Sequence, residues 1–95
     1  MVMKKTLVIN DVEYEIINDY NDGIDKIVLS EKITDYFDNF DYIVGDWAYG
    51  KLRLKGFYDS NNKNCKKIND IAMLKTYIEN NCAYGCKWFQ IKRIK

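Results

Sequence analysis

The sequence predicts an α+β domain in which a mainly antiparallel, five-stranded sheet carries two helices on one face, in the order β-β-α-β-β-α-β. Residues 6–17 and 41–59 alternate apolar and polar residues on both sides of a short turn sequence, as β-hairpins do. Two further stretches repeat apolar residues at spacings of three and four, as amphipathic helices do. Strands joined by hairpins are antiparallel, and such a sheet can leave one face for the helices.

Length and composition agree with a single domain spanning residues 1–95. The chain has 47% hydrophobic and 15% aromatic residues, which argues against intrinsic disorder. No apolar run approaches the roughly 20 residues that cross a bilayer. The first residues also lack the apolar block of a secretory signal. We therefore expect a cytoplasmic protein that does not associate with membranes.

The first hairpin is predicted from its alternation and its turn. Asn10 and Asp11 supply the turn chemistry. The apolar residues share one side of each strand: Leu7 and Ile9 before the turn, and Val12, Tyr14 and Ile16 after it. Residues 18–23 are rich in Asn, Asp and Gly, so they predict a loop.

A helix is predicted over residues 24–40. Its apolar residues recur at spacings of four, four and three, which is one face of a helix: Leu29, Ile33, Phe37 and Phe40. Ser30 is a candidate cap, with Glu31 in the first turn after it.

The second half of the chain predicts another hairpin, another helix and a last strand. A second hairpin turns through Ala48, Tyr49 and Gly50, and Gly50 suits the positive φ of a three-residue loop. A second helix is predicted from the spacing of Ile68, Ile71, Leu74 and Ile78, with Asn69 or Asp70 as its cap and Gly85 past its end. Residues 86–95 predict the closing strand.

Charge is divided unevenly along the chain. Residues 11–46 carry a net charge of −9 and residues 51–95 a net charge of +8, although the whole chain has only +1. Such asymmetry is a hint of a polyanion partner. The alternative is that the two halves face each other in the fold and neutralise one another.

The alternating cations of the second hairpin are the main candidate site. Lys51, Arg53 and Lys55 project from one side of a strand while Leu52 and Leu54 point into the core. Trp47 and Tyr49 lie beside them across the turn, and aromatic groups next to cations suit single-stranded nucleic acid. The alternative is a solvated sheet face whose long aliphatic stems cover apolar neighbours.

The last strand could enlarge this patch. It contains Lys92 and Arg93, and pairing beside residues 51–56 would join their charges to the hairpin's. Lys63, Lys66 and Lys67 could extend it further. Equally, a basic terminal strand can protect a sheet edge against aggregation.

Catalysis and metal binding find little support. The chain has no histidine, no phosphate-binding glycine loop before a helix and no nucleophile motif. Asp46 could be an acid of raised pKa if buried, but accepting backbone N–H bonds in a turn is its more ordinary role. Cys65, Cys82 and Cys86 are odd in number and predict reduced, packed thiols rather than a zinc site. We predict no enzyme activity, metal or cofactor, and we identify no small-molecule substrate.

Residues 41–58, "DYIVGDWAYGKLRLKGFY", resemble the signature of the YutD-like family, small uncharacterised proteins of Firmicutes and their relatives. The resemblance extends to "YEIINDYNDGID" before this run and to "YIENNCAYGCKWFQIKRIK" after it. Ala48 stands where glycine is usual, and Lys51 where a polar residue often stands. The resemblance implies a small bacterial protein, sometimes labelled a transcriptional regulator, and implies no catalytic residues.

The function predicted from sequence is a non-catalytic, nucleic-acid-associated binding module, with RNA or DNA as its partner. Its candidate contact residues are Trp47, Tyr49, Lys51, Arg53, Lys55, Lys92 and Arg93. The alternative is a protein–protein adaptor or homodimerisation module that uses the hairpin tip from Trp47 to Tyr49, or an exposed sheet edge.

Overall fold

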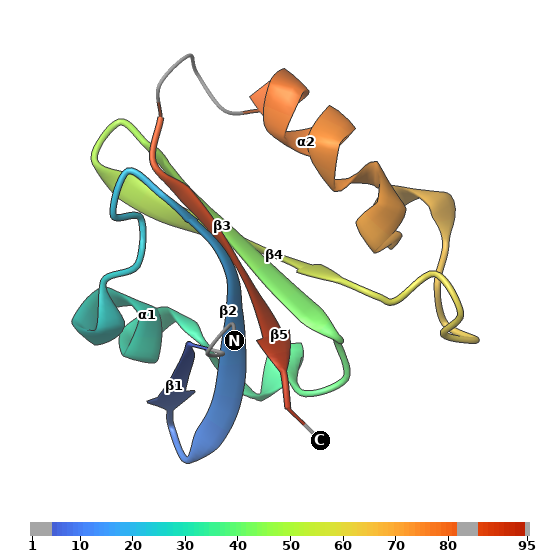
Figure 1. Ribbon diagram of the computed structural model, residues 1–95, viewed down its shortest axis with the longest axis horizontal. Coiled ribbons are helices and arrows are strands. Elements are labelled where there is room, and N and C mark those ends of the chain that lie inside the picture. The colour runs from blue at the N-terminus through green and yellow to red at the C-terminus, as the bar shows by residue number, and fades with distance from the viewer. Residues whose placement is uncertain (1–4, 82–85, 95) are drawn as a thin grey trace.

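The computed structural model describes residues 5–81 and 86–94. Five strands form one sheet in the order β1-β2-β5-β3-β4, and every neighbouring pair is antiparallel. Two α-helices complete an α+β fold, so the predicted class and order of elements are confirmed (Figure 1).

The first hairpin joins β1 (Thr6–Ile9) to β2 (Val12–Tyr20). Asn10 and Asp11 both have positive φ, which the two-residue turn requires and which Asn and Asp tolerate well. The predicted loop at residues 18–23 is wrong for its first half, because β2 continues to Tyr20. Pairing with β5 outweighs the turn propensity of Asn18 and Asp19, and a register shift after Ile16 accommodates them.

The second hairpin joins β3 (Tyr42–Ala48) to β4 (Lys51–Phe57). Its turn has two residues rather than the predicted three, because Ala48 still pairs with Lys51. Tyr49 and Gly50 have φ of 53° and 75°, the conformation of a tight hairpin turn that follows the sheet's twist. The tyrosine therefore occupies a backbone conformation that glycine usually takes.

The first helix is shorter than predicted. α1 spans Lys26–Lys32 and is capped by Asp25, whose carboxylate accepts the N–H groups of Ile27 and Val28. Ser30 is not the cap, since its hydroxyl donates to the Ile27 carbonyl inside the helix. The chain becomes extended at Ile33 and resumes as the 3-10 turn Asp35–Phe37, so the apolar face continues across the break.

The second predicted helix is divided into three pieces. Two 3-10 turns, Lys67–Asn69 and Ile71–Met73, precede α2 (Leu74–Asn81). Asp70 acts as a cap, as predicted, but of the second 3-10 turn, where it accepts the N–H of Ala72. Gly85, the predicted stop, lies outside the described residues.

The last strand, β5 (Trp88–Arg93), lies in the middle of the sheet. It pairs with β2 on one side and β3 on the other. The proposals that it protects an edge or pairs beside β4 are therefore wrong. The N–H and C=O groups of β5 need both neighbouring strands as hydrogen-bond partners. Phe89, Gln90 and Ile91 are buried between these strands.

The sheet has two differently covered faces. On what we call the first face, α1 and the following 3-10 turn cover a core made by Leu7, Ile9, Tyr14, Ile43, Leu52, Phe89 and Ile91 together with Leu29, Ile33 and Phe37. On the second face, α2 lies over the β3–β4 side, where Tyr77 meets Phe57 edge-on. The prediction that both helices share one face is wrong, and Figure 1 shows them on opposite sides of the sheet. Val44 and Phe57 are apolar and buried on the second face, so it too needs a cover.

Candidate functional site

The strand register places the candidate cations as predicted. Lys51, Arg53 and Lys55 are paired with Ala48, Asp46 and Val44 and therefore project from the second face. Leu52 is 3% exposed and points to the core on the first face.

Arg53 is already engaged within the protein. Its Nη2 forms an ion pair with Oδ2 of Asp46 and also donates to the carbonyl of Asn81, at 2.8 Å, where α2 ends. The hydrogen bond to Asp46 raises the pKa of the guanidinium. Asp46 is 1% exposed and lies in β3 rather than in a turn. Its second oxygen, Oδ1, has no hydrogen-bond partner among the described residues.

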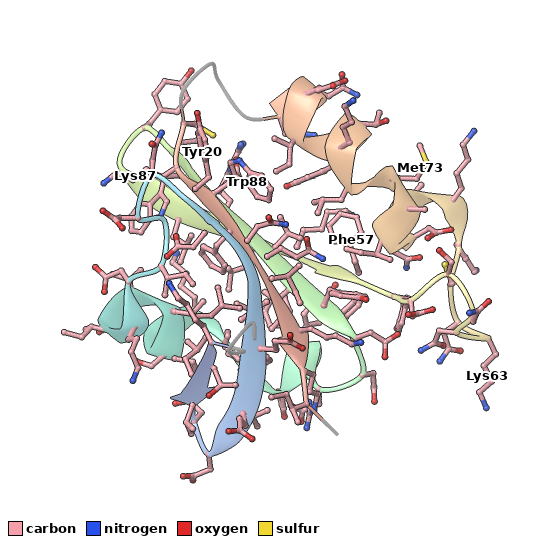
Figure 2. All side chains as sticks on the ribbon, in the orientation of Figure 1. Tyr20, Phe57, Lys63, Met73, Lys87 and Trp88 are labelled. Carbon is pink, nitrogen blue, oxygen red and sulfur yellow. The ribbon has the colours of Figure 1, made fainter. Side chains whose placement is uncertain are left out.

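Lys55 packs over aromatic rings. Its ammonium lies 5.2 Å from the centre of the Phe57 ring and 5.9 Å from that of Tyr77, which is a cation–π arrangement. Burial of Tyr77 between α2 and the sheet, and then the charge of Asp46, raises the pKa of its phenol, against an opposing effect of Arg53. Figure 2 shows Phe57 in the space between the sheet and α2.

The remaining cations do not join these three in one patch. Lys92 and Arg93 are consecutive in β5, so they point to opposite faces. Lys92 lies 5.8 Å from the ring of Tyr42, and Arg93 donates to the carbonyl of Asp38 at 2.8 Å and pairs with its carboxylate at 3.4 Å. Strand β3 separates both residues from β4.

Basic residues on the loops are also far apart. Lys63 lies at the outer tip of the loop before α2, whereas Lys87 lies at the other end of the molecule, near the start of β5 (Figure 2). The loop cation Lys63 therefore does not join the hairpin cations, whereas Lys87 lies beside the hairpin, where its carbonyl accepts the N–H of Trp47 at 3.0 Å.

The two aromatic candidates have different environments. Trp47 packs against the core, and its Nε1–H donates to the carbonyl of Gly23 at 2.7 Å. It ties the hairpin to the loop before α1 and is only partly available to a ligand. Tyr49 is fully exposed at the hairpin tip.

Strand β4 is the outermost strand on its side of the sheet. Within residues 5–81 and 86–94, this strand pairs only with β3. In a two-residue hairpin the closing pair, Ala48 and Lys51, exchanges hydrogen bonds, so alternate residues from Lys51 face β3. The N–H and C=O groups of Leu52, Leu54 and Gly56 consequently point outward.

Tyr58, the residue after β4, makes main-chain hydrogen bonds on the same side of the sheet. Its N–H donates to the Asn69 carbonyl at 2.7 Å, and its carbonyl accepts the Ile71 N–H at 2.9 Å, as in a parallel bridge centred on Asp70. The protein's own chain thus occupies the edge just beyond β4, and within the strand Leu52 and Gly56 are buried as well.

A cavity of about 220 Å³ adjoins β4. It is lined by apolar and polar residues together: Tyr36, Phe40, Leu54, Lys55, Gly56, Ile68 and Asn69. The ring of Phe40 lies so close to Gly56 that a Cβ there would come within 2.4 Å of it. Tyr36 and Ile68 are 69% and 77% exposed. No sequence pattern marks either residue for binding. The apolar spacing predicts Ile68 on the buried face of a helix, whereas it lies in a 3-10 turn.

A larger cavity, of about 530 Å³, lies where β5 ends. It has charged walls of both signs, including Glu15, Asp59 and Lys92. Asp41, also in its wall, accepts the N–H of Asp59 at 2.8 Å and the side chain of Asn62 at 3.0 Å. These bonds hold the loop after β4 against the sheet, so Asp41 has a structural role.

The cysteines only partly follow the prediction of reduced thiols. Cys65 is a free thiol, whereas Cys86 is disulfide-bonded, which contradicts the prediction for that residue. Cys82 lies outside the described residues. In the described part of the chain, no three cysteine or acidic side chains come together as a metal ion would require. None of the helices in that part is long and apolar enough to span a membrane.

Both the sequence and the fold of this chain match known proteins of one family. Residues 8–92 match the family model described as "Putative antitoxin YutD-like". The chain is 38% identical over 89 residues to the "Putative antitoxin YutD" of Bacillus subtilis (strain 168), covering 94% of this chain and 98% of that protein. The solution NMR structure of B. subtilis YutD superimposes with a TM-score of 0.78 at 37% identity, covering 96% of this chain and 83% of the other. The chain therefore belongs to the YutD-like family.

Proposed function

We propose that this protein acts by binding a protein partner, as an antitoxin that holds its toxin in an inactive complex, and that it catalyses no reaction. The observation that carries the proposal is Tyr49, which is fully exposed at the tip of the β3–β4 hairpin on the outer side of the sheet. An exposed aromatic side chain is a typical anchor of a protein–protein contact. The description of the family supports the direction of the proposal.

The distribution of charge also favours a protein partner. Arg53 and Arg93 are each paired with an aspartate, strand β3 separates Lys92 from β4, and Lys63 lies at the outer tip of the loop before α2 (Figure 2). Nucleic-acid binding depends on cations gathered on one surface. A protein contact anchored by an aromatic side chain does not depend on such a gathering of cations.

Photo-crosslinking in the native host tests the proposal. A photoreactive phenylalanine analogue at position 49 or 51 should capture one protein, whereas the same group in place of the exposed Ile27, on α1, should not. The captured protein, expressed alone, should arrest growth, and co-expression of this chain should restore it. Equal capture from all three positions, or a captured protein that is harmless, would count against the proposal.

Nucleic-acid binding remains a second candidate, with one supporting observation. In the described residues, Lys51, Lys63, Lys66, Lys67 and Lys75 form no ion pair with a carboxylate. A gel-shift series with RNA and single-stranded DNA at low salt should show retention that weakens steeply as salt rises. No retention at tens of micromolar protein would eliminate this candidate.

A further inference from the structure

We infer that the cavity beside the tip of the β3–β4 hairpin is a site for an arginine side chain carried by the protein partner. This inference rests on the proposed function and specifies one contact of that partner. The cavity has a volume of about 660 Å³ and lies between the hairpin and the loop before α1. Its walls include Asp22, Asp25, Trp47, Gly50 and Lys87.

The cavity adjoins the contact already proposed. Gly50, in its wall, directly follows Tyr49, the fully exposed residue at the hairpin tip. The hydrogen bond from Trp47 to the carbonyl of Gly23 joins the hairpin to the loop, so the two sides of the cavity are held together. A partner that packs on Tyr49 can therefore place a neighbouring side chain in the cavity.

Trp47 gives the cavity an aromatic wall. The side chain is half-buried, and its Nε1–H is already donated, at 2.7 Å, to the carbonyl of Gly23. What the indole still offers a ligand is therefore its ring rather than its hydrogen-bond donor. The face of an aromatic ring attracts a cation, and a planar guanidinium also stacks on it.

Two carboxylates favour a cation in the same cavity. Asp22 and Asp25 are exposed, and neither forms an ion pair among the described residues. Oδ1 of Asp25 caps α1 by accepting the N–H groups of Ile27 and Val28, which leaves Oδ2 for another donor. A guanidinium carries five N–H donors in a fixed fork, so it can bond two carboxylates at once, whereas an ammonium is a compact point charge.

Lys87 is a cation in the same wall, and it weakens this attraction without reversing it. Two carboxylates and one ammonium leave the cavity with one net negative charge. The ammonium forms no ion pair with either carboxylate among the described residues. A phosphate group would be repelled by both aspartates, so the charge favours a protein side chain over nucleic acid as the occupant.

A peptide titration tests the site directly. The probe is acetyl-Gly-Arg-Gly-amide, added to ¹⁵N-labelled full-length protein, and the reporter is the indole N–H signal of Trp47. This signal should shift saturably with a Kd on the order of 1–10 mM, while that of Trp88, on β5, should move less. The same peptide with citrulline, which is neutral and of nearly the same shape, should bind at least about fivefold more weakly.

Matched variants remove one charge and keep the backbone. Asp25→Asn retains a good helix cap, and Asp22→Asn retains a residue that tolerates the positive φ of 56°. Each should weaken binding of the arginine peptide about threefold, and Lys87→Gln should tighten it about twofold. The control is Asp11→Asn, an exposed residue of positive φ in the turn at the other end of β2, which should leave the Kd nearly unchanged.

The captured partner provides the second test. The cross-link formed from position 49 should map, by mass spectrometry, to a partner segment with an arginine within a few residues. Replacing that arginine with glutamine should weaken the complex about tenfold, and so should the double variant Asp22→Asn/Asp25→Asn. Because both changes remove the same contact, combining them should cost little more than either one alone.

The outcomes separate this inference from the proposed function. Equal binding of the citrulline peptide, tighter binding of a glutamate peptide, or no saturable shift at tens of millimolar arginine peptide would overturn the site. A toxin captured at position 49 whose affinity ignores the aspartate changes would leave the antitoxin proposal standing without the site. Peptide binding with the expected variant pattern, but no captured toxin, would leave the arginine site and remove the antitoxin proposal.

Discussion

The two faces of the sheet are stabilised by different physics. The first face buries apolar side chains from every strand beneath α1, and Leu29 of that helix is fully buried. The second face is covered only in part, by α2, none of whose residues is buried. Its contacts with the sheet include a hydrogen bond from Arg53, one aromatic pair and the ammonium of Lys55 over the Tyr77 ring.

This difference predicts which part of the molecule can open locally while the rest stays folded. A face held by many buried apolar contacts opens only with the whole fold, whereas a helix held by a few half-exposed contacts can open locally. We therefore expect substitutions on the first face to act on global stability, and substitutions on the second face to act mainly on α2.

The largest effect is expected for Phe89→Ala. The ring is fully buried and packs so closely on Gly45 that a Cβ there would lie 2.3 Å from it. Its removal should lower the free energy of unfolding by about 3–5 kcal/mol. Urea denaturation followed by tryptophan fluorescence measures this, and a loss below about 1 kcal/mol would show that the first face is not the dominant core.

The next effect concerns the ion pair beneath α2. Arg53→Met leaves the buried carboxylate of Asp46 without its charged partner, so the urea midpoint should fall by less than for Phe89→Ala but clearly. The double variant Asp46→Leu/Arg53→Met should recover at least half of that fall, because it removes both charges. The more exposed pair offers the control, since Arg93→Met should change the midpoint little. A double variant as unstable as the single one would contradict this account.

A smaller effect is expected on α2 itself. Tyr77→Ala removes the edge-on contact with Phe57 and should cost about 1 kcal/mol. Hydrogen exchange should show the amides of α2 exchanging faster in the variant while those of β5 exchange at nearly the wild-type rate. Equal acceleration in both elements would mean that α2 and the sheet unfold together.

The smallest effect is a pH dependence in alkali. Burial raises the pKa of Tyr14 above its ordinary value of 10.0, with Arg93 opposing the shift and Asp38 adding to it. The folded state therefore holds this proton more tightly than the unfolded state, so the stabilisation is complete below the unfolded pKa and is lost as the pH rises through the folded pKa. Tyr14→Phe should flatten the fall of the urea midpoint above about pH 10. An unchanged slope would assign that fall to other groups, such as Tyr77.

Much of the fold could be predicted because its signals are local. Asn10 and Asp11 tolerate positive φ, and alternation in residues 42–57 assigns each side chain to a face whatever the strand order. The same alternation predicted that Lys51, Arg53 and Lys55 would share a side.

The candidate site was predicted less well because its properties depend on distant segments. The partners of Arg53 and Trp47 are Asp46, Asn81 and Gly23, and nothing local in the sequence pairs them. The cavity beside β4 joins Tyr36 to Ile68, which are 32 residues apart in sequence. The sequence pattern could predict only that Lys51, Arg53 and Lys55 share one side of a strand and that the sheet has an edge.

The sequence by itself determined the elements, their hairpin pairing and the side of each strand that is apolar, since these follow from side-chain alternation and turn chemistry over a few residues. Only the tertiary structure decided that β5 enters the middle of the sheet, that the helices cover opposite faces, and that β4 is the outermost strand. These features arise from competition among all segments to pair their main chains and bury their apolar sides, and that competition is settled between residues far apart in the chain.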